Sequence, residues 1–329
     1  MRDKSYRAYP LGGEAANYLR WKRGRITPST YRDYEACLDK LARVFPDLEV
    51  ASFEPPVGTQ QLEEFLDHQW GEREPRTYNK NLSIIKDFFK YLVLKGKLHG
   101  DPALPLVTHK KRDVHRETFS DKSRLLIITQ GPSPDHLLRD SIALHLLLDY
   151  GIRKGALQHI QFRHFDHSRQ RLVIFTKGEK VRELPIVDKA LWDNLSIHQL
   201  QHDYQGAHYL MCRQRVQMSF RGYDPVTGKA KVERIQHEYP DKPMGAHGLH
   251  DWWYGCLERA GVTDKGQTSG AKMHMARHTA GQRVLDKTGN LKAVQKLLGH
   301  ASIATTADVY TDWDIDQLAE TMREVTGAE

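Results

Sequence analysis

His274-Met-Ala-Arg277-His278-Thr279, Leu298-Gly299-His300 and Ala304-Thr-Thr-Ala-Asp-Val-Tyr310 follow one another near the end of the 329-residue chain. Arg and His side chains are donors suited to the non-bridging oxygens of a phosphate. A Tyr hydroxyl can attack phosphorus and form a covalent ester. Because these residue types recur in order on consecutive predicted helices, the segment indicates an enzyme that breaks nucleic-acid backbones through a phosphotyrosine.

The composition is compatible with a polyanionic partner. The formal net charge is +7 and the pI is about 9.1, values that many unrelated basic proteins share. The length favours two domains. Cys37, Cys212 and Cys256 lie far apart and lack the spacing of a metal site. Neither a signal peptide nor a run of about 20 apolar residues is visible, so we expect a cytoplasmic, nucleoid-associated protein with reduced thiols and no membrane partner.

The N-terminal third is predicted to form a small helical unit. After an extension over residues 1–13, apolar residues recur at helical spacing through residues 14–100, and Thr27-Pro28-Ser29-Thr30 supplies a helix start signal. A linker is expected over residues 101–118. Its basic run, Lys110-Lys-Arg112, either tracks a phosphate backbone or is part of a solvated, flexible connection.

Residues 119–329 are predicted to form a second unit that is mainly α with a small antiparallel β-sheet. An apolar helix is expected over Leu137–Tyr150. The runs Leu172–Thr176 and Arg182–Val187 have the composition of strands and should pair as a hairpin. The segment 213–248 is rich in Gly, Pro, His and charge, which indicates an extended loop or a small β insertion.

Several side chains could together bind and attack a phosphate, because phosphoryl transfer without metal needs cations beside the equatorial oxygens. Each has an ordinary alternative role, such as an exposed Arg after a helix, a Lys at a hairpin tip, a His at a turn or a packed Tyr. His274 and His278 have a metal-ligand spacing but lack a third ligand, so we expect no metal. The candidates are Arg153, Lys177, His274, Arg277, His300 and Tyr310.

The joint order of these residues resembles the tyrosine recombinase (phage integrase) family, and the resemblance extends over almost the whole chain. In the N-terminal unit, Thr27-Pro-Ser-Thr-Tyr31 and Phe88-Phe89-Lys90-Tyr91-Leu92 look like the core-DNA-binding domain of that family. The motifs of the second unit are Tyr150-Gly-Ile-Arg153, Thr176-Lys-Gly-Glu-Lys-Val-Arg-Glu-Leu-Pro-Ile186, His274-x-x-Arg277-His278-Thr279 and Leu298-Gly-His300 with Thr305-Thr306 and Tyr310.

The resemblance implies a role for each candidate. Arg153 and Arg277 would clamp the scissile phosphate, and His300 would hydrogen-bond it. Lys177 would protonate the leaving 5′ oxygen, and His274 would act as acid and base for the tyrosine. Tyr310 would form a 3′-phosphotyrosyl bond, which conserves bond energy, so that no metal, ATP or other cofactor is needed.

One position departs from the pattern of the family. An acidic residue usually follows three positions after the first Arg, whereas this chain has Ala156 there, in Arg153-Lys-Gly-Ala-Leu157. That acid supports the cationic cluster rather than reacting. Its absence therefore bears on the support of the site and leaves open which acid, if any, replaces it.

The resemblance also implies a two-domain clamp around double-stranded DNA, with short inverted-repeat core sites and a tetramer on two duplexes. Only residues 1–13 precede the helical unit, which fits the simple type without an arm-binding domain. A tail helix is expected at about 313–326, docked on a neighbouring protomer or on its own domain. The alternative functions are DNA relaxation of the type IB topoisomerase kind and DNA binding without catalysis.

Basic side chains of the N-terminal unit and linker are candidate contacts to DNA phosphates, although some will belong to solvated helix faces. Asn79 and Asn81 are candidates for reading bases. The basic candidates are Arg20, Lys22, Arg23, Arg25, Arg76, Lys80, Lys86, Lys90, Lys110, Lys111 and Arg112.

Overall fold

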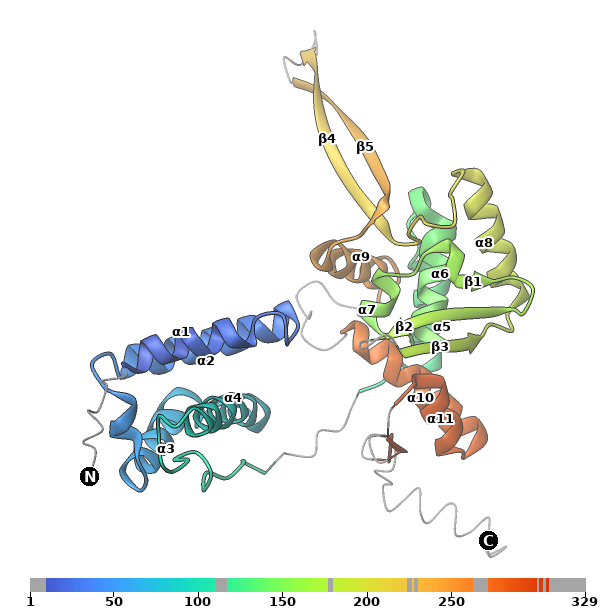
Figure 1. Cartoon of the computed structure of the whole chain (residues 1–329). Coiled ribbons are helices and arrows are strands. Elements are labelled where there is room, and N and C mark those ends of the chain that lie inside the picture. The colour runs from blue at the N-terminus through green and yellow to red at the C-terminus, as the bar shows by residue number, and fades with distance from the viewer. Residues whose placement is uncertain are drawn as a thin grey trace, which may run out of the picture. The chain divides into compact units, whose positions relative to one another are not determined.

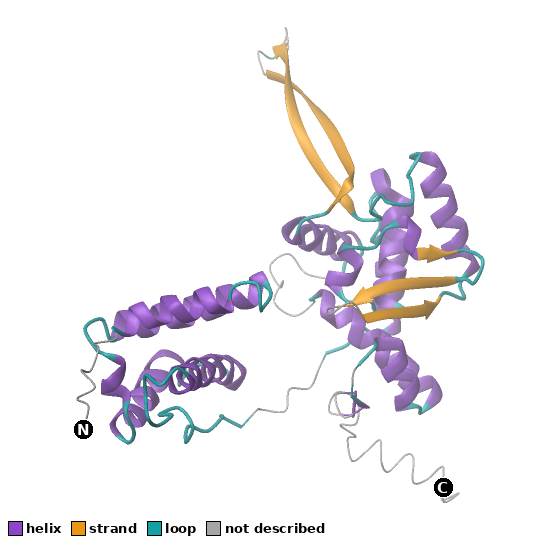
Figure 2. Cartoon of the chain, in the orientation of Figure 1, coloured by secondary structure: helices purple, strands orange, loops and turns teal. Residues whose placement is uncertain are grey.

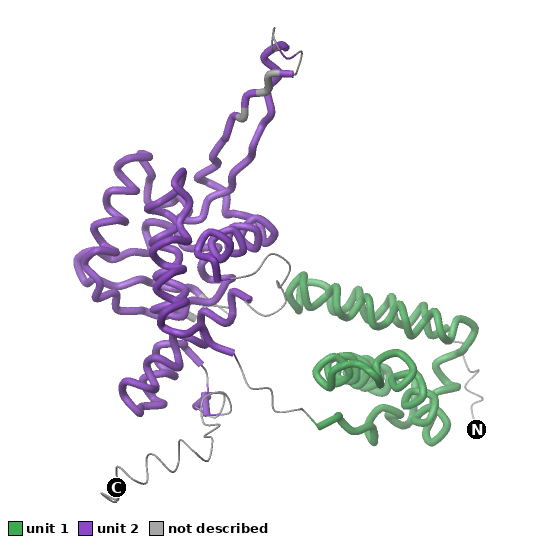
Figure 3. The backbone as a smooth tube through the Cα atoms, turned by 180° about the vertical axis from the view of Figure 1, so that it is seen from behind, with its two compact units in different colours: residues 1–114 green, residues 115–329 purple. Residues whose placement is uncertain are grey.

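The chain divides into two compact units, residues 1–114 and residues 115–329 (Figure 3). The computed structural model describes residues 10–110, 117–176, 180–223, 227, 230–262, 272–300, 302, 303, 306 and 307. Helices dominate both units, and the described strands all belong to the second (Figure 2). The predicted fold class, mainly α with a small antiparallel sheet in the C-terminal domain, is therefore confirmed.

The first unit is built from amphipathic helices around an aromatic core. The side chain of Thr27 caps α2 by accepting a hydrogen bond from the Thr30 backbone N–H at 3.3 Å, as the start signal predicts. Tyr18, Phe88 and Phe89 are fully enclosed. The elements are α1 Leu11–Lys22, α2 Pro28–Val44, the 3₁₀ turn η1 Val50–Phe53, α3 Val57–Trp70 and α4 Pro75–Leu94.

The first part of the proposed linker lies on the first unit. Ala103 and Leu106 are buried in the same core as the helices. The Asn79 amide donates to the His109 carbonyl and accepts from its N–H, both at 2.8 Å. The Tyr78 and His109 rings stack with centroids 3.6 Å apart. Residues 103–109 are thus held by packing and by paired hydrogen bonds, and Lys110 follows them directly.

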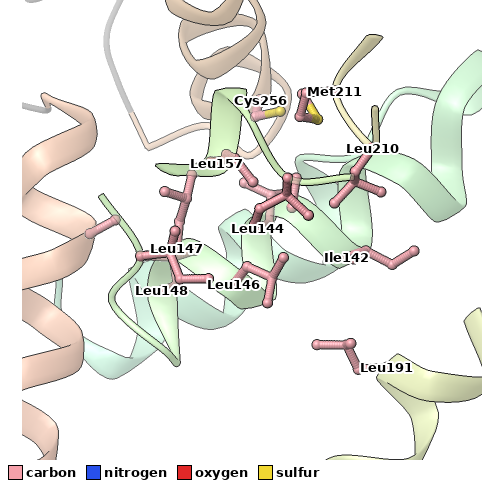
Figure 4. Close-up of a cluster of buried hydrophobic side chains, with 14 of the residues drawn as sticks. Ile142, Leu144, Leu146, Leu147, Leu148, Leu157, Leu191, Leu210, Met211 and Cys256 are labelled. Carbon is pink, nitrogen blue, oxygen red and sulfur yellow. The ribbon is translucent and has the colours of Figure 1, made fainter. Parts of the chain in front are cut away.

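The core of the second unit surrounds α6, Leu137–Leu148. Leu144, Leu146, Leu147 and Leu148 are all fully buried, because this helix is apolar on nearly every side (Figure 4). It packs against α5 Asp121–Gln130, α8 Lys189–Gln201 and α10 Met273–Thr288. The remaining helical elements are η2 Pro134–His136, α7 Lys154–Gln158, η3 Phe162–His164, α9 Ala246–Arg259 and α11 Leu291–Leu298. In the described chain, no helix has the length and apolarity to cross a membrane.

A three-stranded antiparallel sheet lies beside this core, in the order β1 Phe165–Asp166, β2 Arg171–Thr176 and β3 Lys180–Pro185. Leu172 pairs with Leu184, and both are buried. The predicted hairpin is therefore confirmed, because alternate residues of both strands cover the helices.

The segment 213–248 contains a second, larger hairpin where we expected a loop or a small β insertion. Strands β4 Cys212–Tyr223 and β5 Ala230–Pro243 pair in antiparallel fashion and project from the body of the second unit (Figure 1). At about 3.4 Å per residue, β4 extends roughly 40 Å.

Candidate active site

The turn Leu298-Gly299-His300, directly after α11, organises the candidate site. Asn290 begins α11 by accepting hydrogen bonds from the Lys292 and Ala293 backbone N–H groups at 2.9 and 3.1 Å. Gly299 ends the helix in the left-handed region, with φ 62°. A Cβ at this position would lie 2.8 Å from Nη1 of Arg182. The left-handed backbone conformation favours glycine, and a side chain at this position would displace the Arg182 guanidinium.

Arg277 joins this turn to the end of α6. Its side chain is 2 % exposed, and Nη1 donates to the Gly151 carbonyl at 2.6 Å while Nη2 donates to the Leu298 carbonyl. Gly151 also has a φ of 62°, and a Cβ there would lie 2.6 Å from Cδ2 of Leu298. Carbonyl oxygens carry only partial charge, so these two bonds fix the guanidinium without neutralising it.

Arg153 contacts the next residue of the same turn. It is the N-cap residue of α7, and its Nη2 donates to the Gly299 carbonyl at 3.2 Å. Burial lowers the pKa of Arg153, because the charged guanidinium has lost part of its hydration. An anion beside it would compensate for that loss.

A third arginine, Arg182 of β3, lies in this cluster and was not among the predicted site residues. Burial, and then the charge of Arg153, lowers the pKa of Arg182 to about 10. Its Nε and Nη2 atoms are buried, and neither has a hydrogen-bond partner in the described chain. Buried donors of a charged group are costly to leave unpaired, so Arg182 is prepared for an acceptor.

The sequence does contain a signal for Arg182. Leu184 and Ile186 are buried, and a strand presents every second residue to the same face. Arg182 is the preceding member of that alternation, so the pattern places a cation on an inward face. A cation at this position of the alternation is unusual, and it makes Arg182 a candidate site residue.

His300 completes the turn with a half-buried imidazole. Its Nδ1 lies 3.0 Å from the Thr306 hydroxyl, and its backbone carbonyl accepts a hydrogen bond from the Gln295 amide at 3.1 Å. These contacts fix the ring on the same turn that Arg153 and Arg277 hold. Thr306 is fully buried, so its hydroxyl is a rigid partner.

His274 is exposed on the first turn of α10, Met273–Thr288, and its ring centroid lies 4.8 Å from that of His278. Across the described residues, no cluster of three or more His, Cys, Asp or Glu side chains has a geometry suited to a metal ion.

The position of the missing acid, Ala156, packs against the hydrophobic core. A carboxylate, Asp149, instead lies just before the Tyr150-Gly-Ile-Arg153 turn. It accepts hydrogen bonds from Arg124 at 2.6 Å and from Arg283 at 2.9 Å. Burial alone would raise the pKa of Asp149, but bonds from His145 and Arg124 lower it below its ordinary value. Asp149 therefore links side chains of α5, α6 and α10 beside the site, while the contact described for Arg153 is with a carbonyl.

Two predicted catalytic residues, Lys177 and Tyr310, lie outside the described residues, as does the predicted tail helix at 313–326. Lys111 and Arg112 of the linker lie outside them as well. The roles predicted for these residues therefore rest on the sequence alone.

The basic side chains predicted to contact DNA from the first unit differ in their surroundings. Lys22 is 13 % exposed and pairs with Asp87 at 2.5 Å, so its charge is already engaged within the fold. Arg25 stacks on Trp21 with 4.5 Å to the ring centroid. Lys80 pairs with Asp33 and Lys86 contacts a backbone carbonyl. Arg25 and Lys80 are exposed despite these contacts, and the other exposed members of the set are Arg20, Arg23, Arg76, Lys90 and Lys110.

The prediction that two asparagines read bases is wrong for Asn81 and disfavoured for Asn79. Asn81 is buried, and its amide donates to the Thr77 carbonyl at 2.9 Å. The amide of Asn79 is already engaged on both sides with the His109 backbone. Helical periodicity alone could not distinguish these inward contacts from surface ones.

Three of the described arginines, Arg153, Arg182 and Arg277, thus converge with His300 on one short turn. Their guanidinium groups are partly or fully removed from water, and two of them are fixed by main-chain carbonyls. Such an arrangement presents a concentrated, preorganised positive field, which suits an anion with several oxygens, such as a phosphodiester in its transition state.

Comparisons with known proteins find relatives along most of the chain. Residues 120–316 match the Phage integrase family. The chain is 28% identical over 310 residues to "Tyrosine recombinase XerC" of Pseudomonas syringae pv. syringae (strain B728a), with 92% of this chain and 91% of the relative covered. The protein of the same name from Alcanivorax borkumensis is 26% identical over 260 residues, covering 77% and 74% of the two chains.

Solved structures share the fold at low sequence identity. A lambda integrase dimer bound to a COC' core site superposes with a TM-score of 0.66 and 16% identity, covering 94% of this chain and 81% of that one. The XerH site-specific recombinase bound to a palindromic difH substrate, a post-cleavage complex, gives a TM-score of 0.65 and 14% identity, covering 96% and 99%.

Proposed function

Because the chain belongs to the phage integrase family and is a tyrosine-type site-specific recombinase, we propose a mechanism of that type for it. In this mechanism, the protein cleaves and rejoins DNA through a 3′-phosphotyrosyl intermediate without metal or ATP. The observation that carries the proposal is the convergence of Arg153, Arg182 and Arg277 on the Leu298-Gly299-His300 turn. A metal-free reaction needs cationic side chains to neutralise the phosphate, and this turn concentrates them.

In the proposed mechanism, the two arginines held by carbonyls, Arg153 and Arg277, bind the non-bridging oxygens of the scissile phosphate. Arg182, with its unpaired buried donors, supplies a third cation to the same group. His300, braced by Thr306, donates a further hydrogen bond.

The proton transfers are assigned to residues whose proposed roles rest on family resemblance. The hydroxyl of Tyr310 attacks phosphorus and passes its proton to His274, while Lys177 protonates the departing 5′ oxygen. The product is a phosphodiester between the tyrosine and the 3′ end. Attack of a partner strand's 5′ hydroxyl on this ester reverses the step and releases the enzyme.

We further propose that the two units hold double-stranded DNA as a clamp and that protomers assemble on two duplexes with short inverted-repeat core sites. The lambda integrase tetramer bound to a Holliday junction, with a TM-score of 0.65, supports this assembly by analogy of fold. Among the exposed cations of the first unit, Arg20, Arg23, Arg76, Lys90 and Lys110 fit phosphate contacts.

The test is a trapping experiment with nicked duplexes that carry a randomised core. After cleavage, the short strand beyond the nick diffuses away and religation is prevented. We expect a covalent protein–DNA adduct in EDTA without ATP, mapped by mass spectrometry to Tyr310. Tyr310→Phe should abolish the adduct, because the attacking oxygen is removed.

Tyr223→Phe is the matched control, because Tyr223 is 70% exposed near the tip of the projecting hairpin and lies outside the proposed chemistry. Its adduct yield should equal that of the unmodified protein. Failure of the protein to form an adduct on duplexes that it binds, or an adduct that survives Tyr310→Phe, would refute the mechanism. A product assay with two sites then separates strand exchange from simple relaxation.

A further inference from the structure

The hairpin formed by β4 and β5 has two chemically different sides. Along β4, Arg213 and Arg215 alternate with Gln214, Val216 and Met218. Because successive side chains of a strand point to opposite faces, the two arginines share one face and the other three residues share the opposite one. The face that carries Arg213 and Arg215 is called the cationic side of the hairpin below.

The opposite face is attached to the body of the second unit at its base. The Gln214 amide donates to Oε1 of Glu238 at 2.9 Å, and the Tyr204 hydroxyl donates to Oε2 of the same carboxylate at 2.6 Å. Gln214 and Gln236 also lie 3.1 and 2.8 Å from Nε2 of His136. These contacts fix the base of the hairpin and leave its cationic side facing away from them.

The cationic side contains a shallow pocket of about 190 Å³, the hollow, which is lined by Arg213, Arg215, Tyr239 and Lys242. Arg213 and Tyr239 are direct cross-strand partners. A register shift between Cys212 and Arg213 places Lys242 in a bulge of the partner strand, and its Nζ lies 5.6 Å from the Tyr239 ring centroid. Bulges redirect side chains in this way, so the third cation is brought to the same hollow.

The two arginines of the hollow differ from Arg221 in their ionic partners. Arg221, nearer the tip, pairs with Glu233, whereas neither Arg213 nor Arg215 forms an ion pair in the part of the chain that the structure describes. Glu238 faces the body, and Asp241 does not line the hollow. Three cations therefore surround a space without a lining carboxylate.

We propose that this hollow binds the DNA backbone at a site separate from the turn at residues 298–300. The inference rests on the proposed function, because it takes duplex DNA as the ligand. Two residues of a strand rise by roughly 7 Å, and two nucleotides of one DNA strand rise by a similar amount, roughly 7 Å along the axis. The spacing of Arg213 and Arg215 thus matches that of phosphates two nucleotides apart along the axis, and Lys242 adds a third contact across the ribbon.

The geometry distinguishes this surface from a scattered basic patch. The base of the hairpin is anchored through Glu238, so the backbone that carries the cations is already placed before a ligand binds. Phosphate contacts of this kind position a duplex and do not read its sequence. The expected contribution of the hairpin is therefore affinity and orientation, independent of base sequence.

The test measures the salt dependence of binding of the full chain to a short duplex of arbitrary sequence. The slope of log K against log salt is negative, and each phosphate contact contributes about −0.9 to it. The double variant Arg213→Gln with Arg215→Gln should therefore make the slope less steep by about 2. The control on the same strand is Arg221→Gln, which removes one positive charge from an existing ion pair, compared with two in the double variant. Its slope should equal that of the unmodified protein.

Equal slopes for the double variant and the unmodified protein would overturn the proposal, as would an equal decrease in Arg221→Gln. A change confined to self-association in sedimentation would also overturn it, because the surface would then bind protein. Binding does not require cleavage. A slope change without a Tyr310 adduct therefore refutes the proposed mechanism alone, and an adduct without a slope change refutes the hairpin contact alone.

Discussion

The second unit holds two sets of arginines in opposite environments. Arg153, Arg182 and Arg277 are partly or fully buried around one glycine turn, where carbonyl groups fix two of them. Arg213 and Arg215 are exposed on the projecting hairpin. A charge in a low-dielectric site acts strongly at short range, whereas an exposed charge is screened by salt. The same residue type thus suits transition-state stabilisation in one place and duplex positioning in the other.

The largest effect is expected from Arg277→Lys. Lysine keeps the charge but lacks the planar fork that donates to both the Gly151 and Leu298 carbonyls. Single-turnover cleavage should fall by about 10²-fold or more, the usual result of losing a preorganised donor, while duplex affinity changes little. A thermal melt controls for folding. A folded variant that cleaves at the normal rate would contradict the role of the buried set.

A second prediction concerns the support beneath the site. Asp149→Asn removes a carboxylate that accepts from Arg124 and Arg283, and the unfolding free energy should fall by about 1–3 kcal/mol at neutral pH. The pKa of Asp149 is lowered in the folded state, so its contribution is complete above the ordinary value of 3.8 and is lost as pH falls through the folded value.

Urea unfolding across pH measures this effect. The stability gap between the unmodified protein and Asp149→Asn should be constant at neutral pH and narrow as the pH falls below 3.8. A gap that widens in acid would show that the carboxylate is not stabilised by its cationic partners.

Salt should separate the two sets of arginines. Between about 50 and 200 mM salt, duplex affinity is expected to decrease by orders of magnitude, because phosphate contacts release counterions. The single-turnover cleavage rate at saturating DNA should change by less than about twofold, since the buried set lies where mobile ions screen poorly. A cleavage rate that follows the affinity would place the catalytic cations at the surface.

The smallest effect is expected from Glu233→Gln on the hairpin. This change frees Arg221 from its ion pair, and an exposed pair contributes only about 0–1 kcal/mol to stability. The melting temperature should hardly change. If the freed guanidinium reaches a phosphate, the slope of log K against log salt should become slightly steeper. A marked loss of stability would mean that the pair holds the hairpin together.

Much of the architecture could be predicted because local signals agree with tertiary packing. Thr27 caps its helix, and the alternation in β2 and β3 predicts both their pairing and their buried faces. The hairpin over β4 and β5 was expected only as an extended loop or a small β insertion. Its strands project from the body, so neither face needs the apolar alternation by which strands are recognised.

The candidate site was predictable in residue types but not in geometry. Arg153, Arg277 and His300 follow from the order of the motifs, whereas their connection through the Leu298 and Gly299 carbonyls requires the fold. Arg182 was missed because a charged residue in a short strand usually faces solvent. Lys22 was expected to contact DNA, but it pairs with Asp87. Helical spacing could not predict this pair, because it does not show which residues of other helices face a cation.

The most direct test of the buried set compares cleavage of a nicked duplex with a normal scissile phosphate and with a methylphosphonate, in which one charged oxygen is replaced by a methyl group. With phosphate, Arg182→Gln should cleave at least about tenfold more slowly than the unmodified protein, because a neutralising cation is lost. With methylphosphonate, the difference should largely disappear, since less charge remains to neutralise. An equal loss on both substrates would show that Arg182 supports the fold and does not neutralise the phosphate.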